Sequence, residues 1–367
     1  MKICHILLLA VMLSACSPST TMSSALHTPL TADLTECAQS PCSKSPDMRV
    51  IAYLPGYKGL SDSLAQVELN HISHLNLAFA NPDSNGEFMQ NGKMLCMPGR
   101  GTEQVDLTEI HATVKRAHAA GVKVLMSVAG GVLPDCAGNW HDLLQADKRE
   151  QVVNSLVDMM TDFNLDGLDI DLEGLLLTKI DSAGRYTPFV QALSAKLKPH
   201  GKLLTSATAS YEGGMIPVSS IPYFDFVNIM SYDAIGPSWG KAGSEHATYQ
   251  QAEYDIQLWL KRGLTKQQLV LGLPFYGYGF GQYNRDYTLN DIAMLFGNDV
   301  LQQDVIGELC SQCSYITYNG MATLQAKTHL ARTHGSGVMI WELSQDLKGD
   351  ASVLAVIKRQ LANHKPN

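Results

Sequence analysis

The feature that most constrains the fold is a series of short apolar runs that alternate with amphipathic stretches from Arg49 onward. Each run has the length of a buried β-strand, and apolar residues recur at helical spacing in the stretches between runs. Eight runs occur, at 49–54, 74–80, 122–129, 165–172, 202–209, 225–232, 269–274 and 337–343. Eight strands that alternate with helices predict an α/β protein, a (β/α)8 TIM barrel with a short insertion between strands 7 and 8.

Two connecting stretches carry the clearest helical signals. The stretch 106–120 ends at Gly121, a residue type that favours a helix C-terminus, and 147–163 carries apolar residues at helical spacing. The longest connection, about 275–336, has room for a small subdomain or a lid. A doubly wound sheet is the alternative fold, but it usually needs a Gly-rich phosphate loop after an early strand, and the glycines of 277–282 follow the seventh run. Further helices are predicted at 184–199, 251–263, 321–334 and 351–364.

The N-terminal residues differ in composition and periodicity from the rest of the chain. Lys2 precedes an apolar run at 6–13 that is too short to span a bilayer, so residues 1–15 are predicted to be a secretory signal peptide. The ending Leu-Ser-Ala-Cys at 13–16 resembles a bacterial lipobox, which implies cleavage before Cys16 and acylation of Cys16. A soluble export signal with an incidental cysteine is the alternative.

The segment 16–47 is rich in Ser, Thr and Pro and shows little periodicity, which predicts a tether between the lipid and the folded domain at 48–367. In bacterial lipoproteins, a residue such as Ser17 after the acylated cysteine usually implies the outer membrane. We therefore expect an outer-membrane protein anchored only by its N-terminal lipid, on the periplasmic or the cell-surface side.

Cysteine usage is typical of an exported protein. Of the eight cysteines, Cys4 is removed with the signal and Cys16 takes the lipid, so six remain for disulfides in an oxidising compartment. The alternative for Cys310 and Cys313 is half of a zinc site or a redox pair, but no second Cys pair or suitably spaced His completes a metal site. We predict no metal and no cofactor. The predicted disulfides are Cys37–Cys42, Cys96–Cys136 and Cys310–Cys313.

Composition and charge narrow the partners. With 45% hydrophobic and 17% charged residues, the chain has the composition of a globular protein. The formal net charge is −8 and no Lys/Arg run occurs, so nucleic acid is not an expected partner. The protein is expected to be a monomer.

The run at 165–173, with the sequence LDGLDIDLE, places acidic residues at alternate positions. Side chains alternate between the two faces of a strand, so Asp169, Asp171 and Glu173 are expected to face the barrel interior and the apolar residues between them the helices. Burial and mutual repulsion raise the pKa of such carboxyls, which suits the outermost, Glu173, to act as a general acid. The alternatives are a structural carboxylate cluster or a calcium site, although the apolar spacers fit a barrel strand better than a calcium loop.

This run resembles the active-site signature of glycoside hydrolase family 18, the chitinases and related endo-N-acetylglucosaminidases. Its pattern DxxDxDxE is met at Asp166, Asp169, Asp171 and Glu173. The resemblance spans about residues 48–360, and its other motifs fall at the ends of predicted strands. These motifs are SVAGG at 127–131, MSYD at 230–233, GLPFYGYGF at 272–280 and GVMIWELSQD at 337–346.

The resemblance implies a role for several residues. Glu173 resembles the acid that protonates the glycosidic oxygen, and Asp171 the residue that orients the acetamido group of the substrate and stabilises a cyclic intermediate. Asp169 and Ser127 resemble supporting partners of Asp171. Tyr232 resembles the hydroxyl that holds the acetamido carbonyl.

The resemblance also implies substrate-binding residues. Asp233 resembles a nearby substrate contact, and Trp341 the aromatic floor of the −1 sugar subsite. Many family members have an Arg where this chain has Tyr278, so the resemblance does not extend to the substrate contact of that Arg. The further predicted substrate-binding residues are Tyr53, Phe79, Gly130 and Met230.

The spacing of the carboxylates limits the mechanism. Asp171 and Glu173 lie two residues apart on one strand, whereas a double-displacement glycosidase needs carboxylates on opposite sides of the anomeric carbon. No other motif supplies the opposing carboxylate, so the acetamido oxygen of the substrate is expected to be the nucleophile. The predicted partner is an oligo- or polysaccharide that contains N-acetylglucosamine, cleaved by a retaining mechanism.

Three functions are compatible with these residues. The first is hydrolysis of chitin or chito-oligosaccharides, and the second is endo-β-N-acetylglucosaminidase activity on N-glycans. The third is a catalytically silent glycan-binding protein, which is disfavoured because Glu173 is present. The short insertion suggests a shallow groove and endo-acting cleavage. Several residues near the barrel mouth serve either as further sugar subsites or in packing, among them Tyr57, Asp135, Trp140, Tyr211, Trp239, Tyr249 and Tyr276.

Overall fold

The computed structural model describes residues 48–101 and 103–362. The predicted signal peptide at 1–15, the tether at 16–47, the lipidation site Cys16 and the pair Cys37–Cys42 all lie outside these described residues. Within the described residues, no helix combines the length and apolar character needed to cross a membrane.

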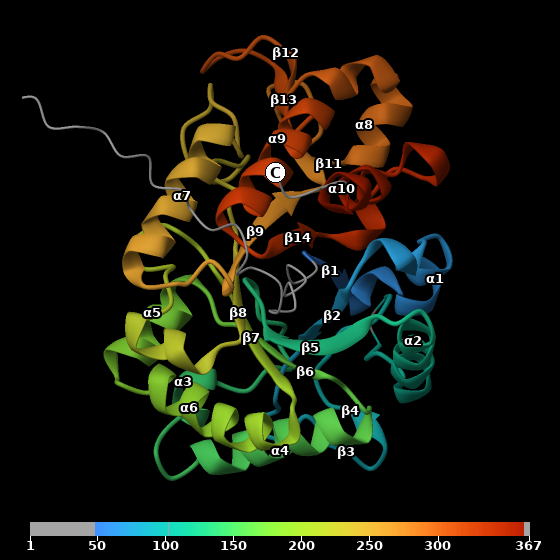
Figure 1. The fold of residues 1–367 in the computed structure, drawn as a ribbon. Coiled ribbons are helices and arrows are strands. Elements are labelled where there is room, and N and C mark those ends of the chain that lie inside the picture. Colours follow the sequence, from blue (N-terminus) through green and yellow to red (C-terminus); the bar gives the residue numbers. More distant parts are fainter. Residues whose placement is uncertain (1–47, 102, 363–367) are drawn as a thin grey trace, which may run out of the picture. The chain divides into compact units, whose positions relative to one another are not determined.

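Eight parallel strands close into a barrel in the order β1-β14-β9-β8-β7-β6-β5-β2, which confirms the predicted TIM-barrel fold. Figure 1 shows the helices arranged around these strands. Each predicted run overlaps one strand of the barrel, and only β1 extends past its run, by one residue. The strands are β1 (Arg49–Pro55), β2 (His74–Ala80), β5 (Lys123–Ala129), β6 (Gly167–Asp171), β7 (Leu203–Thr208), β8 (Phe226–Ile229), β9 (Leu269–Pro274) and β14 (Gly337–Trp341).

The connecting helices follow the predicted amphipathic stretches, with ends shifted by a few residues. The side chain of Asp106 caps the first of them by accepting a hydrogen bond from the N–H of Thr108. The helices α2 (Leu107–Ala119), α4 (Arg149–Asp162), α6 (Tyr186–Leu197), α7 (Tyr249–Arg262), α9 (Met321–His334) and α10 (Val353–Ala362) match the six predicted ones. Four shorter helices were not predicted, namely α1 (Leu60–Ala65), α3 (Trp140–Leu143), α5 (Gly174–Ser182) and α8 (Leu289–Phe296).

The alternation along β6 separates two apolar regions. Leu168, Ile170 and Leu172 join the large core between the strands and the helices. A smaller cluster fills the barrel interior, and it includes Ile51, Tyr53, Phe226, Val270 and Met339. The acidic residues of β6 point toward this interior, as the period of two predicts.

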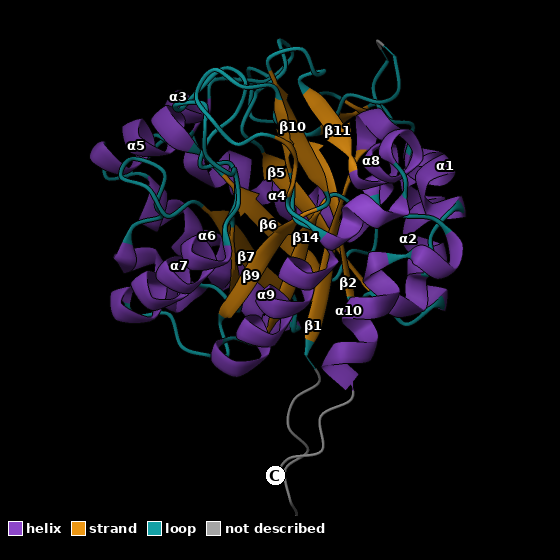
Figure 2. Cartoon of the chain, turned by 90° about the horizontal axis from the view of Figure 1, so that it is seen from above, coloured by secondary structure: helices purple, strands orange, loops and turns teal. Residues whose placement is uncertain are grey.

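The insertion between β9 and β14 is a small α+β subdomain. Its antiparallel sheet has the order β11-β10-β13-β12, and α8 follows β11. In Figure 2, β10 and β11 extend beyond the barrel strands on the side where the connecting loops gather. The insertion therefore stands beside the mouth of the barrel. Its strands are β10 (Tyr276–Phe280), β11 (Asp286–Thr288), β12 (Val305–Gly307) and β13 (Tyr315–Thr317). The described residues also include a short hairpin, β3 (Met89–Gln90) with β4 (Lys93–Met94).

Two of the three predicted disulfides are confirmed. Cys96 and Cys136 are joined across a sequence separation of 40 residues, and Cys310 and Cys313 across a separation of three. The second pair lies in the connection between β12 and β13, so neither of its cysteines is available as a metal ligand.

Candidate active site

Asp169 is the innermost carboxylate of β6, and it is fully buried in the barrel. Its Oδ2 accepts hydrogen bonds from the hydroxyls of Tyr53 and Ser127, each at 2.7 Å. Its Oδ1 accepts from the Thr205 hydroxyl at 2.5 Å and from the Asn228 amide at 3.4 Å. Burial nevertheless raises the pKa of Asp169, because the loss of water outweighs these four donors.

Asp171 lies one step closer to the barrel mouth and is only 3% exposed. Its Oδ1 has no hydrogen-bond partner among the described residues. Burial, with the charges of Glu173 and Asp169, raises the pKa of Asp171 well above its usual range. The buried Asp171 carboxyl therefore lowers the folding stability of the free protein, and its unpaired oxygen can accept a hydrogen bond from a bound ligand.

Glu173 ends the acidic run and immediately precedes α5, but its side chain makes no capping hydrogen bond. Burial, together with the charge of Asp233, raises the pKa of Glu173 to about 7. Gly131 gives the carboxyl its space, because a Cβ at that position would lie 2.9 Å from Oε1 of Glu173. A carboxyl with this pKa can both deliver and accept a proton near neutral pH.

An aromatic floor lies beside the carboxylates. Trp341 stacks on Phe79 with ring centroids 5.6 Å apart and an interplanar angle of 16°, and the ring of Tyr53 lies 5.7 Å from Trp341. Gly130, at a φ of +88°, lets Phe79 approach, since a Cβ there would lie 2.7 Å from that ring. The structure thus brings four predicted substrate-binding residues together.

The carboxyl of Glu173 opens into a cleft of about 660 Å³. Tyr232 and Met230 line this cleft at the end of β8, next to Asp233. Asp233 has a positive φ of 62°, and its Oδ1 accepts a hydrogen bond of 2.6 Å from the hydroxyl of Tyr276. The remaining lining residues are Ala209, Ser210, Tyr211, Ala234, Trp239, Gln251 and Asp255.

Comparison with known proteins decides the family. Over residues 49–346, the sequence matches the family model described as glycosyl hydrolases family 18. The chain belongs to this family. It is a glycoside hydrolase of the chitinase type.

Individual relatives agree with this assignment. The crystal structure of a family 18 chitinase from the chitin utilization locus of Flavobacterium johnsoniae is 31% identical, with a TM-score of 0.72, and the match covers 86% of this chain and 94% of that chain. The class V chitinase of Arabidopsis thaliana is 23% identical over 335 residues, which are 77% of this chain and 83% of that protein. A mutant class V chitinase from Nicotiana tobaccum, solved in complex with NAG4, shares the fold at 18% identity and a TM-score of 0.65, over 86% of this chain and 99% of that chain.

Some relatives match only part of this chain and part of their own length. The chain matches 34% of the length of the chitinase-like mite allergen of Dermatophagoides farinae, at 29% identity over 169 residues.

Asp166, the first acidic residue of the signature, lies at the other end of β6 from Glu173. Its Oδ2 accepts a hydrogen bond from the N–H of Val124 and lies 2.8 Å from Nε2 of His118. Asp166 therefore ties β6 to β5 and α2 and does not reach the cleft.

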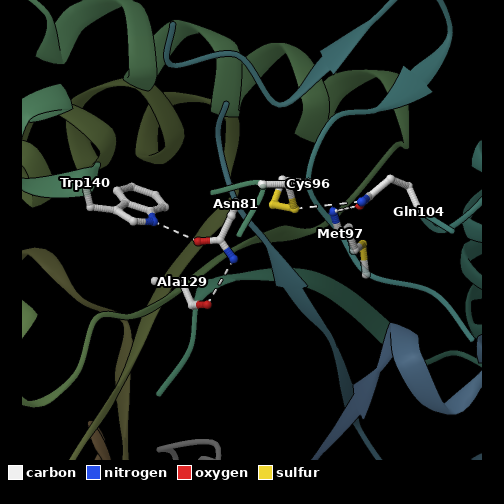
Figure 3. The surroundings of a disulfide bond; sticks show 7 residues. Asn81, Cys96, Met97, Gln104, Ala129 and Trp140 are labelled. Atoms are coloured by element: carbon white, nitrogen blue, oxygen red, sulfur yellow. Dashed lines mark hydrogen bonds between the residues drawn. A yellow bond between two sulfur atoms is a disulfide. The ribbon is translucent and has the colours of Figure 1, made fainter. Parts of the chain in front are cut away.

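The aromatic residues predicted near the mouth fall into two groups. Tyr57, Tyr211 and Trp239 are about half exposed, at 46%, 58% and 45%. Trp140, in contrast, is fully buried and serves in packing. Its indole N–H donates to Oδ1 of Asn81, close to the Cys96–Cys136 disulfide (Figure 3).

Sequence reasoning assigned no role to several residues of the site, among them Thr205, Asn228 and Gly131, although Gly131 lies in the motif at 127–131. Thr205 and Asn228 donate to Asp169, and Gly131 leaves room for Glu173. The strand register identifies Thr205 as a partner of Asp169, because the two residues pair directly and share the inward face. In residues 48–101 and 103–362, no group of three His, Cys, Asp or Glu side chains is arranged to hold a metal ion.

Proposed function

We propose that the enzyme hydrolyses β-1,4-linked N-acetylglucosamine polymers, chitin or chito-oligosaccharides, with retention of configuration and with Glu173 as general acid and base. The observation that carries this proposal is Oδ1 of Asp171, which has no hydrogen-bond partner among the described residues and is buried at the end of β6, two residues before Glu173. The amide N–H of a 2-acetamido sugar supplies the missing donor. A sugar without that group leaves the oxygen unsatisfied, which costs about 1–3 kcal/mol.

The other carboxylates of the cleft support the use of a substrate nucleophile. Asp233 is held by the hydroxyl of Tyr276 at 2.6 Å. Asp255 accepts hydrogen bonds from Ser231 at 2.7 Å and from Gln251 at 2.6 Å. Both carboxylates are engaged by protein donors, and in the proposed mechanism the acetamido oxygen of the substrate is the nucleophile.

The reaction then runs in two steps. Glu173 donates its proton to the glycosidic oxygen as the bond to the anomeric carbon breaks, and the acetamido oxygen attacks that carbon to form a cyclic intermediate. Asp171 accepts a hydrogen bond from the acetamido N–H, which keeps its proton, and the hydroxyl of Tyr232 donates a hydrogen bond to the acetamido oxygen. Glu173, now ionised, takes a proton from a water molecule that attacks the anomeric carbon and opens the ring. One water is consumed, and two inversions at the anomeric carbon give net retention.

A set of matched substrates tests this proposal. We expect the enzyme to cut chitohexaose, to release the β-anomer first in early NMR spectra, and to leave fully deacetylated glucosamine hexamer intact. The variant Glu173→Gln should bind chitohexaose but cut it at least 1,000-fold more slowly. Undiminished hydrolysis by that variant, or cleavage of the deacetylated hexamer, contradicts the mechanism. A high-mannose glycoprotein assayed in parallel distinguishes the substrates, because cleavage of it alone replaces chitin by N-glycans.

We also propose that the enzyme is anchored to a bacterial outer membrane by a lipid on Cys16. The lipobox-like sequence at 13–16, followed by Ser17, supports this proposal. In membrane fractionation of the producing cell, we expect Cys16→Ala to leave the outer-membrane fraction and to lose incorporation of labelled fatty acid. An unchanged distribution would contradict the anchor.

A further inference from the structure

We propose that His246, in the connection between β8 and α7, is a positioning residue that holds the carboxylate of Asp233 next to the acid Glu173. This inference rests on the proposed function, in which Glu173 is the acid. Asp233 and Glu173 line the same cleft, whereas His246 lies behind Asp233 and outside the cleft lining. The motifs of the sequence did not point to this histidine.

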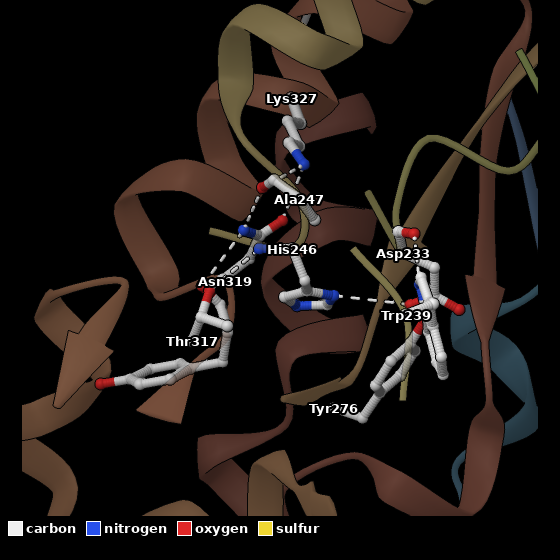
Figure 4. Close-up of polar contacts among 9 residues, drawn as sticks. Asp233, Trp239, His246, Ala247, Tyr276, Thr317, Asn319 and Lys327 are labelled. Carbon is white, nitrogen blue, oxygen red and sulfur yellow. Dashed lines mark hydrogen bonds and ion pairs between the residues drawn. The ribbon is translucent and has the colours of Figure 1, made fainter. Parts of the chain in front are cut away.

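The imidazole of His246 is fully buried. Its Nδ1 lies 3.6 Å from Oδ1 of Asp233, and neither ring nitrogen has a hydrogen-bond partner within the described residues. Figure 4 shows the ring directed at Asp233. The rings of Tyr276 and Tyr278 pack around it, each with its centroid 5.3 Å from the imidazole. An approach of about 0.6 Å makes a full hydrogen bond, and such bonds often tighten only when substrate binds.

The backbone of His246 is fixed on both sides. Its N–H donates to Oγ1 of Thr317 on β13 at 3.1 Å. Its carbonyl accepts from the N–H of Ala234 at 2.9 Å, immediately after Asp233. The insertion and the loop that carries Asp233 therefore hold the histidine between them.

A buried lysine strengthens this anchorage from α9. Lys327 donates to the carbonyl of Ala247 at 3.0 Å and to Oδ1 of Asn319 at 2.8 Å. The amide of Asn319 donates to the same carbonyl at 2.6 Å. Two donors thus fix the carbonyl of the residue that follows His246, as Figure 4 shows, so the backbone that carries the imidazole is held in place.

The electrostatics define what the imidazole does. The titratable groups that face it are Asp233, Tyr276 and Tyr278 across the ring and Lys327 behind it. Burial lowers the pKa of His246, and the charge of Lys327 adds to this effect while Asp233 opposes it. A neutral imidazole carries one N–H, and in the Nδ1–H form this hydrogen is available to Oδ1 of Asp233, 3.6 Å from Nδ1.

His246 thereby acts on Glu173 through Asp233. Its ring nitrogen and the hydroxyl of Tyr276 both hold the carboxylate of Asp233 in position. The charge of Asp233 in turn helps to keep the proton on Glu173. The other titratable groups that face Glu173 are Asp171, Tyr211 and Tyr232.

Two substitutions of similar size separate positioning from packing. In His246→Asn, the amide nitrogen takes roughly the place of Nδ1, while His246→Leu fills the same space without a donor. We expect His246→Leu to lower kcat on chitohexaose about 2- to 5-fold at pH 7, because the basic limb of the kcat profile moves down by about 0.5–1 pH unit from the Glu173 pKa of about 7. KM should change less than threefold. We expect His246→Asn to restore most of the kcat and the wild-type profile.

A direct titration of Glu173 provides a readout that does not depend on activity. In carboxyl-13C NMR of Glu-labelled protein, assigned with Glu173→Gln, the Glu173 midpoint should fall in His246→Leu and not in His246→Asn. If His246→Leu does not fold, Tyr276→Phe removes the second donor and should lower the same midpoint.

The outcomes separate the two proposals. Unchanged pH profiles and unchanged Glu173 midpoints in the leucine and phenylalanine variants overturn the role of His246. Equal losses in the leucine and asparagine variants also overturn it, because they show a packing role. If the wild-type enzyme cuts none of the N-acetylglucosamine substrates while the Glu173 midpoint still falls in His246→Leu, the proposed function is overturned and the inference stands.

Discussion

Replacing Glu173 with Gln should stabilise the enzyme at alkaline pH while it abolishes hydrolysis. The reason is the raised pKa of the Glu173 carboxyl, which burial and the charge of Asp233 move from 4.5 to about 7. Below pH 4.5 the carboxyl is neutral in both the folded and the unfolded chain, so it adds no cost. As the pH rises toward 7, the unfolded chain loses this proton first, and folding stability is lost over that window.

The size of the effect follows from the same two pKa values. They differ by about 2.5, from 4.5 in the unfolded chain to about 7 in the folded one, and each pKa unit corresponds to 1.36 kcal/mol. Above pH 7, ionised Glu173 therefore lowers the free energy of unfolding by about 3 kcal/mol. Glutamine is neutral in both states and removes this cost. The variant should gain about 3 kcal/mol at pH 8.5 and close to nothing at pH 4.

Denaturant unfolding at pH 4, 6 and 8.5 measures this gain, with wild type and variant compared at each pH. A matched control is Glu253→Gln, which makes the same chemical change at an exposed position of α7. The control should show no comparable rise with pH. A gain of the same size at all three pH values, or a destabilised Glu173→Gln at pH 8.5, would refute the idea that the Glu173 carboxyl is desolvated.

Three further changes test other parts of the site and the fold. Gly131→Ala places a methyl group 2.9 Å from Oε1 of Glu173, so we expect kcat to fall at least 10-fold with the melting temperature nearly unchanged. Thr205→Val removes the hydroxyl that donates to Asp169 at 2.5 Å and should cost about 1–3 kcal/mol in urea unfolding, with a larger loss at pH 8 than at pH 4. Replacing the Cys96–Cys136 pair with serines should cost about 4 kcal/mol, because the disulfide closes a loop of 40 residues; the pair at the tip of the insertion, with a separation of three, should cost under about 2 kcal/mol in the same assay.

The barrel was predictable because its strands are buried on both faces. Each of the eight apolar runs overlaps one barrel strand, since parallel strands in such barrels read as continuous apolar segments. The connection from β7 to β8 lacked a helical pattern and contains only a 3-10 helix, Val218–Tyr223. The missed helices α1, α3 and α8 have eight residues or fewer, too short for a helical period to be read.

Strand periodicity predicted the site only along β6, whereas the residues on other strands, such as Ser127 and Tyr232, were predicted only from the family resemblance. The period of two assigns the inward face of β6 from sequence alone, and this face holds Asp169 and Asp171. The register across strands supplies the rest, because Ser127 and Thr205 flank Asp169 in neighbouring strands. Threonine is common in strands, and nothing in β7 itself marks Thr205 as a partner of a buried carboxylate.

The contrast between the two buried aspartates shows which of them lowers the folding stability of the free enzyme. Four donors converge on Asp169, while Oδ1 of Asp171 has none within the described residues. Extra hydroxyls in the barrel interior would satisfy Asp171 as well, and they would stabilise the free enzyme. They would also compete with the amide of the substrate for the same oxygen. Asp171 and Glu173 therefore lower the stability of the free enzyme, and a bound ligand restores this stability. For this reason we expect stabilising changes at this end of β6 to reduce hydrolysis.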